Sequence, residues 1–274
     1  MGIPSIAARA LTRLMFWFNI FKKVRGVSIK MQLGMILSAF VDVLLNAVTP
    51  SLAALPRVYV SGTVYSKSYD VYFYVRAFSD DLYSVMPERE GDVNELILNC
   101  LKKGDLFVDV GANIGYYSVL VGKIVGENGR VISVEPIPNT TKVLNFNLEL
   151  NNLRNVKVVQ KAAWSDNGTV TMYIPKGYFG MASVYKPSGA TDVLTVKRAP
   201  LDGIFEASRV DLLKIDTEGS EYPVLVGARK ILKKTKYVIL EASQEKDKIV
   251  RLLGEEGFKI RKLKFTTYIF AYRN

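Results

Sequence analysis

The ten residues 106–115 constrain the fold of this chain more than any other part of the sequence. Residues 106–110 form a short, largely apolar run, which is typical of a strand buried on both faces of a parallel sheet. Gly111 and Gly115 mark the turn that follows, and a helical pattern then continues through Val125. This succession of strand, glycine turn and helix predicts an α/β domain.

The same alternation continues toward the C-terminus. It comprises predicted strands at 131–134, 156–159, 212–215 and 237–241, predicted helices at 139–151, 219–232 and 245–254, and a terminal hairpin at 259–272. Repeated units of strand and helix favour helices on both faces of a mostly parallel sheet. We therefore predict a doubly wound, Rossmann-like domain over residues 105–274.

The chain has 274 residues and contains no histidine, which excludes a histidine base, a histidine-containing triad and a histidine metal ligand. The single cysteine, Cys100, cannot form an intrachain disulfide, so a reducing, cytoplasmic location is expected. With 49% hydrophobic and 23% charged residues, the composition is that of a folded globular protein.

Residues 1–57 differ from the rest because they are both apolar and basic. They hold seven basic residues against one acid, Asp42, and so carry +6 of the net charge of +11. The run 33–48 approaches the length of a membrane span, and Pro50 is expected to end or bend its helix. However, Ser38, Asp42 and Asn46 recur at intervals of four residues and share one helical stripe.

Two interpretations of residues 1–57 remain open, with a true membrane span ranked third. The segment is either a helical cap that packs on protein or a basic amphipathic helix that binds the inner face of an anionic membrane. Asp42 and the N-terminal position of the positive charge both argue against a span. A cleaved signal peptide is not expected, and the sequence does not set the oligomeric state.

A second segment, residues 58–104, is predicted to lead into the main domain. Strands are expected at 58–60 and 71–75, because both stretches are β-branched and aromatic. Ser61-Gly62 and Lys67-Ser68 supply turn residues between them, and a short helix is expected at 94–101. We interpret the tyrosine-rich strands as the half-buried face of a hairpin.

The glycine turn and the acid after it predict a nucleoside cofactor. Glycine at 111 and 115 would let the backbone pass close to a ligand, and Glu135 ends the next strand, where an acid can bind ribose hydroxyls. The turn lacks the G-x-G-x-x-G pattern of dinucleotide sites. Asp109 would repel a pyrophosphate but could bind an ammonium group, which favours S-adenosylmethionine; a plain turn or capping role is the alternative.

Residues 107–118, Val134-Glu135-Pro136, 155–168 and the block 213–221 resemble motifs of the FkbM-type methyltransferases, and the resemblance spans residues 82–242. It implies a class I methyltransferase fold and S-adenosylmethionine as cofactor. Many members have a histidine near the position of Glu241, which this chain lacks. The matching motifs imply a cofactor pocket formed by Asp109, Gly111, Asn113, Gly115, Tyr116, Glu135, Pro136 and Ala162.

The catalytic candidates follow the predicted strand 212–215. Asp216 stands where open α/β sheets bind their ligands, and without histidine it is the first candidate base, with Glu218 second. Lys214 could hold the acceptor oxygen or pair with an acid. Mg²⁺ bound by Asp216, Glu218 and Glu241 is a less favoured alternative, so no metal is assigned.

The function predicted from these residues and the resemblance is O-methylation of a hydroxyl on a sugar, glycolipid or small metabolite. A nucleic-acid methyltransferase is an alternative suggested by the positive charge. Nucleic acid is not the expected partner, because most of the excess charge lies in residues 1–57 and no Asn-Pro-Pro-Tyr-like motif follows the fourth strand. A noncatalytic cofactor-binding module is the second alternative, and the acceptor itself is not specified by the sequence.

Overall fold

The computed structural model describes residues 5–48, 55–87, 89–189, 191–263 and 267–273. The chain forms two compact units, Met1–Arg89 and Glu90–Asn274. The segment 58–104 predicted from the sequence therefore contributes to both units.

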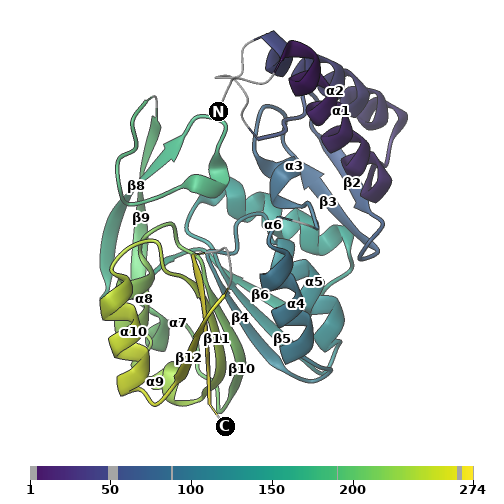
Figure 1. The fold of residues 1–274 in the computed structure, drawn as a ribbon. Helices are drawn as coiled ribbons and strands as arrows, with labels where there is room; N and C mark the ends of the chain where they lie inside the picture. The colour runs from purple at the N-terminus through teal and green to yellow at the C-terminus, as the bar shows by residue number, and fades with distance from the viewer. Residues whose placement is uncertain (1–4, 49–54, 88, 190, 264–266, 274) are drawn as a thin grey trace. The chain divides into compact units, whose positions relative to one another are not determined.

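The N-terminal unit begins with two helices, α1 (Ile6–Lys23) and α2 (Ile29–Val48), which lie side by side (Figure 1). The Ser5 hydroxyl caps α1 by accepting a hydrogen bond from the backbone N–H of Ala8, and lysines in the last turn suit the negative end of the helix dipole. Helix α2 contains the predicted run 33–48 but starts four residues earlier. Pro50, expected to end it, lies outside the described residues.

A three-stranded antiparallel sheet completes this unit, together with the short helix α3 (Asp81–Ser84). Its strands, in the order β1-β2-β3, are Val24–Gly26, Gly62–Ser66 and Val71–Val75. The strand predicted at 58–60 is wrong: that stretch is irregular, and the strand that pairs with β3 starts at Gly62, which was expected to be in a turn. In β3 the side chains alternate as a half-buried strand requires, with Val71, Phe73 and Val75 buried.

The C-terminal unit is built on a seven-stranded sheet in the order β12-β13-β11-β10-β4-β5-β6. The strands from β11 to β6 are parallel, whereas β13 is antiparallel to both β11 and β12 and lies between them. The strands are β4 (Leu106–Val110), β5 (Arg130–Val134), β6 (Val156–Val159), β10 (Val210–Ile215), β11 (Thr235–Glu241), β12 (Lys259–Lys262) and β13 (Tyr268–Tyr272).

Helices cover both faces of this sheet, as the prediction of a doubly wound domain requires (Figure 1). One face carries α4 (Gly91–Cys100), α5 (Tyr116–Val125) and α6 (Pro138–Leu150). The other carries α8 (Glu221–Val226), α9 (Arg229–Lys233) and α10 (Lys246–Glu255), close to the short helix α7 (Leu201–Ile204). The single helix expected over 219–232 is two helices, separated at Gly227 and Ala228. Gly227 passes so close to β7 that a Cβ there would collide with the backbone carbonyl oxygen of Trp164.

A second small sheet in this unit was not predicted. It consists of β7 (Ala162–Trp164), β8 (Gly168–Pro175) and β9 (Thr191–Pro200), in the order β7-β9-β8, with the 3₁₀ turn η2 (Phe179–Met181) between β8 and β9. Its inner side chains form a core of their own, in which Met172 and Ile174 pack with Ile137. This sheet stands beside the carboxyl end of the main sheet and shapes what lies there.

The strand order reverses between β4 and β10, because β5 and β6 lie on one side of β4 and the later strands on the other. Such a reversal leaves a crevice outside the carboxyl ends of the two strands. The loops that begin at Gly111 and at Asp216 therefore meet, and the N–H of Asp216 donates to the carbonyl oxygen of Val110 at 3.0 Å. The predicted fold class is confirmed, and it places the candidate site at this edge.

Candidate functional site

A pocket that is partly open to solvent lies at the carboxyl ends of β4, β5 and β10. Its walls contain five of the eight predicted cofactor residues and two of the three predicted catalytic ones: Gly111, Asn113, Glu135, Pro136, Ala162, Asp216 and Glu218. Among the described residues that line it, Glu135, Asp216 and Glu218 are acids and Lys161 is a base. This balance suits a ligand that carries positive charge rather than a pyrophosphate.

Gly111 and Gly115 both have positive φ, +78° and +89°, which favours glycine at each position. The reason that a Cβ is excluded differs from the predicted one. At Gly111 a Cβ would collide with the backbone carbonyl oxygen of Asp216, and at Gly115 with the side chain of Leu144. These glycines therefore allow the loops of this unit to pack closely, and only Gly111 lines the pocket.

Glu135 ends β5 and is held by backbone N–H groups at both carboxylate oxygens. Oε2 accepts from the N–H of Asn113 at 3.0 Å, and Oε1 accepts from the N–H of Ile137 at 2.9 Å. A carboxylate oxygen can accept more than one hydrogen bond, so a carboxylate at this position can also accept from a ligand hydroxyl. The carboxylate is thus fixed in the pocket wall in the position predicted for a ribose contact.

Asp109 lies beneath the pocket rather than in its wall, and it is 1% exposed. Its Oδ2 accepts from the hydroxyl of Ser118 at 2.7 Å, whereas Oδ1 is buried and has no hydrogen-bond partner among the described residues. Burial raises the pKa of Asp109, although the nearby Lys214 ammonium opposes this shift. A buried oxygen without a partner costs free energy, which a cationic ligand group would offset.

Gly115 and Tyr116 also lie outside the pocket wall. Tyr116 is buried at the start of α5, where its hydroxyl accepts a hydrogen bond from the side-chain amide of Asn94 at 3.3 Å. Both residues therefore support the loop from within the protein, and neither is placed to touch a ligand in the pocket.

Asp216 follows β10 and is held by two donors. Its Oδ2 accepts from the Lys214 ammonium at 3.0 Å and from the Tyr268 hydroxyl at 2.8 Å. Lys214 does not line the pocket: it is 2% exposed, and its Nζ lies 4.9 Å from the ring centre of Tyr117. Of the two roles considered for Lys214, the structure supports pairing with an acid.

Burial alone would lower the pKa of Lys214, but the carboxylates of Asp216, Asp109 and Glu90 raise it above its usual value. Lys214 is therefore a buried ammonium. It interacts electrostatically both with Asp109, beneath the pocket, and with Asp216, the candidate base.

The loop 216–220 is organised by the next acid along the chain. Oε1 of Glu221 accepts from the N–H groups of Thr217 and Gly219, each at 3.0 Å, and from the Thr217 hydroxyl at 3.1 Å. Glu221, in the first turn of α8, thus fixes the loop that precedes this helix. Glu218 lies in this loop with φ of +53°, a region that non-glycine residues seldom adopt, and it lines the pocket.

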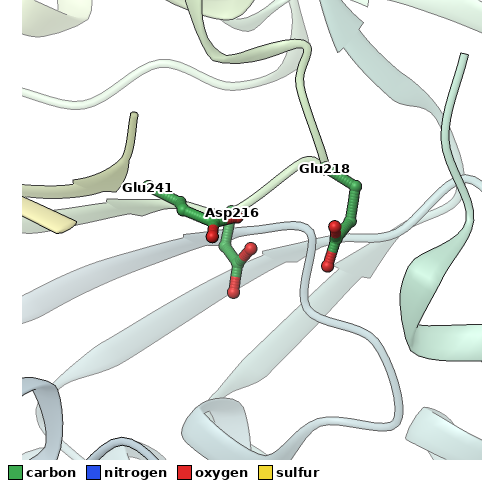
Figure 2. Close-up of side chains that lie close together, drawn as sticks. All are labelled: Asp216, Glu218 and Glu241. Atoms are coloured by element: carbon green, nitrogen blue, oxygen red, sulfur yellow. The ribbon is translucent and has the colours of Figure 1, made fainter. Parts of the chain in front are cut away.

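Glu241, at the end of β11, comes close to the two candidate acids (Figure 2). Asp216, Glu218 and Glu241 each offer one oxygen, and these atoms lie within 4.8 Å of one another. Burial and the neighbouring charge of Asp216 raise the pKa of Glu241, although its hydrogen bond from Thr267 opposes the shift. The arrangement could bind a divalent ion, but an ion on Asp216 would lie beside the Lys214 ammonium, which repels it.

Sequence reasoning missed Tyr268 and four pocket residues that lie on β8 or between β8 and β9, which are Met172, Phe179, Ala182 and Val184. The alternation of residues 169–174 gave a usable signal, because Val170, Met172 and Ile174 occupy every second position. Tyr268 gave none, since its contact depends on how β13 pairs with β11.

Comparison with protein families identifies the domain. A family model described as the methyltransferase FkbM domain matches residues 109–263, which is more than half of the chain. The chain belongs to the FkbM methyltransferase family. A model of protein-L-isoaspartate(D-aspartate) O-methyltransferase also matches, over residues 44–168. The family confirms the enzyme class, an S-adenosylmethionine-dependent methyltransferase, and with it the predicted cofactor.

Two curated relatives match over most of their length. Methyltransferase sdnD of Sordaria araneosa is 26% identical over 249 residues, covering 77% of this chain and 90% of that protein. Hexuronic acid methyltransferase AglP of Haloferax volcanii is 27% identical over 169 residues, covering 61% and 68%. The first curated relatives, among them protein-L-isoaspartate O-methyltransferases, match over 59 or 60 residues, so the chain spans only 27–31% of their length.

Among solved structures, the FkbM methyltransferase of Methylobacillus flagellatus has a TM-score of 0.47 and 19% identity. The match covers 69% of this chain and 48% of that one.

Proposed function

We propose that this protein methylates a hydroxyl group on a sugar, glycolipid or small metabolite. The observation that carries the proposal is the pocket at the switch point, which has Glu135 on one wall and Asp216 on another. Both acids stand at carboxyl ends of parallel strands, where this fold binds its ligands. The name of the relative AglP, a hexuronic acid methyltransferase, supports a sugar acceptor.

The residues of the pocket fit S-adenosylmethionine. In the proposed arrangement Glu135 binds the ribose hydroxyls, Gly111, Asn113, Pro136 and Ala162 form the surrounding wall, and Asp109 contributes negative charge from below. When bound, S-adenosylmethionine supplies an electrophilic methyl group on a sulfonium centre. The acidic lining attracts such a cation.

Asp216 is the proposed general base, with Glu218 as second candidate. The ammonium of Lys214 and the hydroxyl of Tyr268 both donate to Oδ2 of Asp216 and so fix the direction of its carboxylate. A carboxylate held in this way can accept the proton of an acceptor hydroxyl during attack. Lys214 and Tyr268 are positioning residues in this scheme, because both act through Asp216.

Two measurements test the proposal. Isothermal titration with S-adenosylmethionine and S-adenosylhomocysteine should give binding of both, whereas binding of NAD alone would overturn it. Labelled S-adenosylmethionine incubated with fractions of a cell extract should then label a glycan, lipid or small-molecule fraction. Label that resists mild alkali indicates a methyl ether on a hydroxyl, as proposed. Alkali-labile label on protein would indicate a methyl ester, and label on RNA would indicate a nucleic-acid methyltransferase. Each of these last two results would contradict the proposed acceptor.

The metal alternative is tested in the same assay. We expect a chelator to leave labelling unchanged, because Lys214 already neutralises Asp216. Loss of labelling with EDTA and its restoration by Mg²⁺ would instead assign Asp216, Glu218 and Glu241 to a metal site.

A further inference from the structure

Where α1 and α2 meet, they enclose a cluster of polar side chains, whereas many large apolar side chains of both helices face outward. Asp42 of α2 lies at their interface, where Oδ1 accepts from Arg13 Nη2 at 3.0 Å and from the Asn46 amide at 3.1 Å. Its Oδ2 accepts from the indole N–H of Trp17 at 2.6 Å and from Arg13 Nε. The one acid of this segment is thus paired within the hairpin, which removes the objection to lipid contact raised by its charge.

Helix α1 turns an apolar face away from this interface. Leu11, Leu14, Met15 and Phe18 follow helical spacing, and each is 54–60% exposed. The neighbouring Trp17, by contrast, is buried against α2. The exposed side of α1 is therefore a continuous apolar stripe.

Helix α2 exposes a longer stripe of the same kind. Leu33, Ile36, Leu37, Phe40 and Leu44 recur at intervals of three and four residues, and each is 50–63% exposed. We call the exposed stripes of α1 and α2 the hairpin outer face. Exposed apolar surface on this scale marks an interaction site.

We propose that the hairpin outer face docks on an anionic lipid bilayer. Lys22, Arg25 and Lys30 are exposed where α1 ends and α2 begins, and Lys22 Nζ lies 4.5 Å from the ring centre of Phe18, at the edge of the apolar face. Basic side chains beside an apolar stripe suit negatively charged headgroups above acyl chains.

The hairpin lies in the plane of the membrane rather than across it. By length and composition α2 could cross a bilayer, with a mean hydropathy of 1.7. However, protein covers its other side: the Ser38 hydroxyl accepts from the N–H of Tyr59 at 3.0 Å, and Gly34 packs on Val60. A span would carry the irregular backbone of residues 58–60 into hydrocarbon, which is costly. The outer face therefore enters only to a depth of roughly 5–10 Å.

Flotation of the full chain with preformed vesicles tests this proposal independently of methyl transfer. We expect stronger binding to phosphatidylcholine vesicles containing phosphatidylglycerol than to phosphatidylcholine alone. The double variant Phe18→Gln/Phe40→Gln should weaken binding about tenfold or more, because each phenylalanine loses its apolar contact with lipid. The matched control is Val193→Gln, an exposed apolar position on β9 that should leave binding unchanged.

Fluorescence of Trp17, which is buried where α1 meets α2, should match wild type in Phe18→Gln/Phe40→Gln and so checks that the hairpin is folded. Equal flotation of wild type and Phe18→Gln/Phe40→Gln would overturn the proposal. Absence of flotation, together with a dimer in water that this double variant dissociates, would assign the face to a second copy of the chain. Bound protein should also transfer to fresh vesicles, and permanent retention would contradict in-plane docking.

Discussion

The helical hairpin α1–α2 of the N-terminal unit and the sheet of the C-terminal unit distribute their charged and apolar side chains differently. In the hairpin, the paired charges of Arg13 and Asp42 are inside and aliphatic residues face outward. In the sheet, apolar side chains such as Leu213 and Val238 are buried, and the acids Glu135, Asp216 and Glu218 line the pocket at the carboxyl ends of the strands. The first arrangement suits an apolar surrounding and the second suits water.

Both units nevertheless use one acid held by several donors. Asp42 receives its hydrogen bonds from residues of the hairpin alone, so its role is to hold two helices together. Asp216 receives its bonds from Lys214 and Tyr268 but also lines a pocket. Exposure to a pocket is what turns a structural acid into a catalytic candidate.

The largest effect is expected from Asp216→Asn. The amide cannot accept a proton from the acceptor, so turnover with the labelled acceptor should fall about 10²- to 10⁴-fold. Cofactor affinity, measured by titration, should change little. Asp247→Asn, an exposed acid of α10, is the control and should keep full turnover. Normal turnover in Asp216→Asn would remove the base assignment.

Asp42→Ala should destabilise the N-terminal unit while sparing the pocket. The change leaves the Arg13 guanidinium and the Trp17 indole without their acceptor in a largely buried position, at a cost of about 3 kcal/mol. Chemical unfolding followed by Trp17 fluorescence measures this cost, after subtraction of the Trp164 signal. A weaker affinity of this variant for S-adenosylmethionine would show that Asp42 also affects the pocket that contains Asp216.

Tyr268→Phe should lower turnover about tenfold, because Asp216 keeps Lys214 but loses the hydroxyl that fixes its direction. A positioning role predicts a lower kcat with an unchanged KM for the acceptor. Tyr272→Phe, on the same strand, is the matched control. A change confined to KM would mean that Tyr268 contacts the acceptor instead.

The smallest effect is a pH dependence of stability. Burial and the charge of Asp216 raise the pKa of Glu241 in the folded state. The protonated Glu241 side chain therefore contributes to stability below the ordinary pKa of a glutamate. This contribution is lost as the pH rises through the raised pKa. Glu241→Gln should therefore have a Tm slightly above that of wild type at pH 8, and the gap should shrink toward pH 4. A gap that is independent of pH would show that the charge of Glu241 has no such cost.

The strand ends of the main sheet were predictable because local and tertiary signals agree there. Residues 106–110 are apolar enough to be buried on both faces, and glycine or an acid follows at once. The strand expected at 58–60 failed for the opposite reason. Its residues have strand propensity, but β3 pairs with Gly62–Ser66 instead. The N–H of Lys67 then donates to the carbonyl oxygen of Lys23, the residue before β1, which continues the pairing of this strand with β1.

The geometry inside the site was less predictable. Lys214 was correctly placed on its strand, but its direction away from the pocket depends on Asp109 and Tyr117, which come from other elements. The small sheet over the pocket has alternating strands that local patterning could have found. The hydrogen bond from Tyr268 could not be found in this way, because it joins residues 52 positions apart.

The position of β13 has a consequence for how the Asp216 carboxylate is held. This strand lies between β11 and β12 and is antiparallel to both, so β12 joins the sheet through β13. Tyr268 is the first residue of β13, and its hydroxyl donates to Asp216. A local opening that separates β13 from β11 would therefore remove one of the donors that fix the direction of the candidate base.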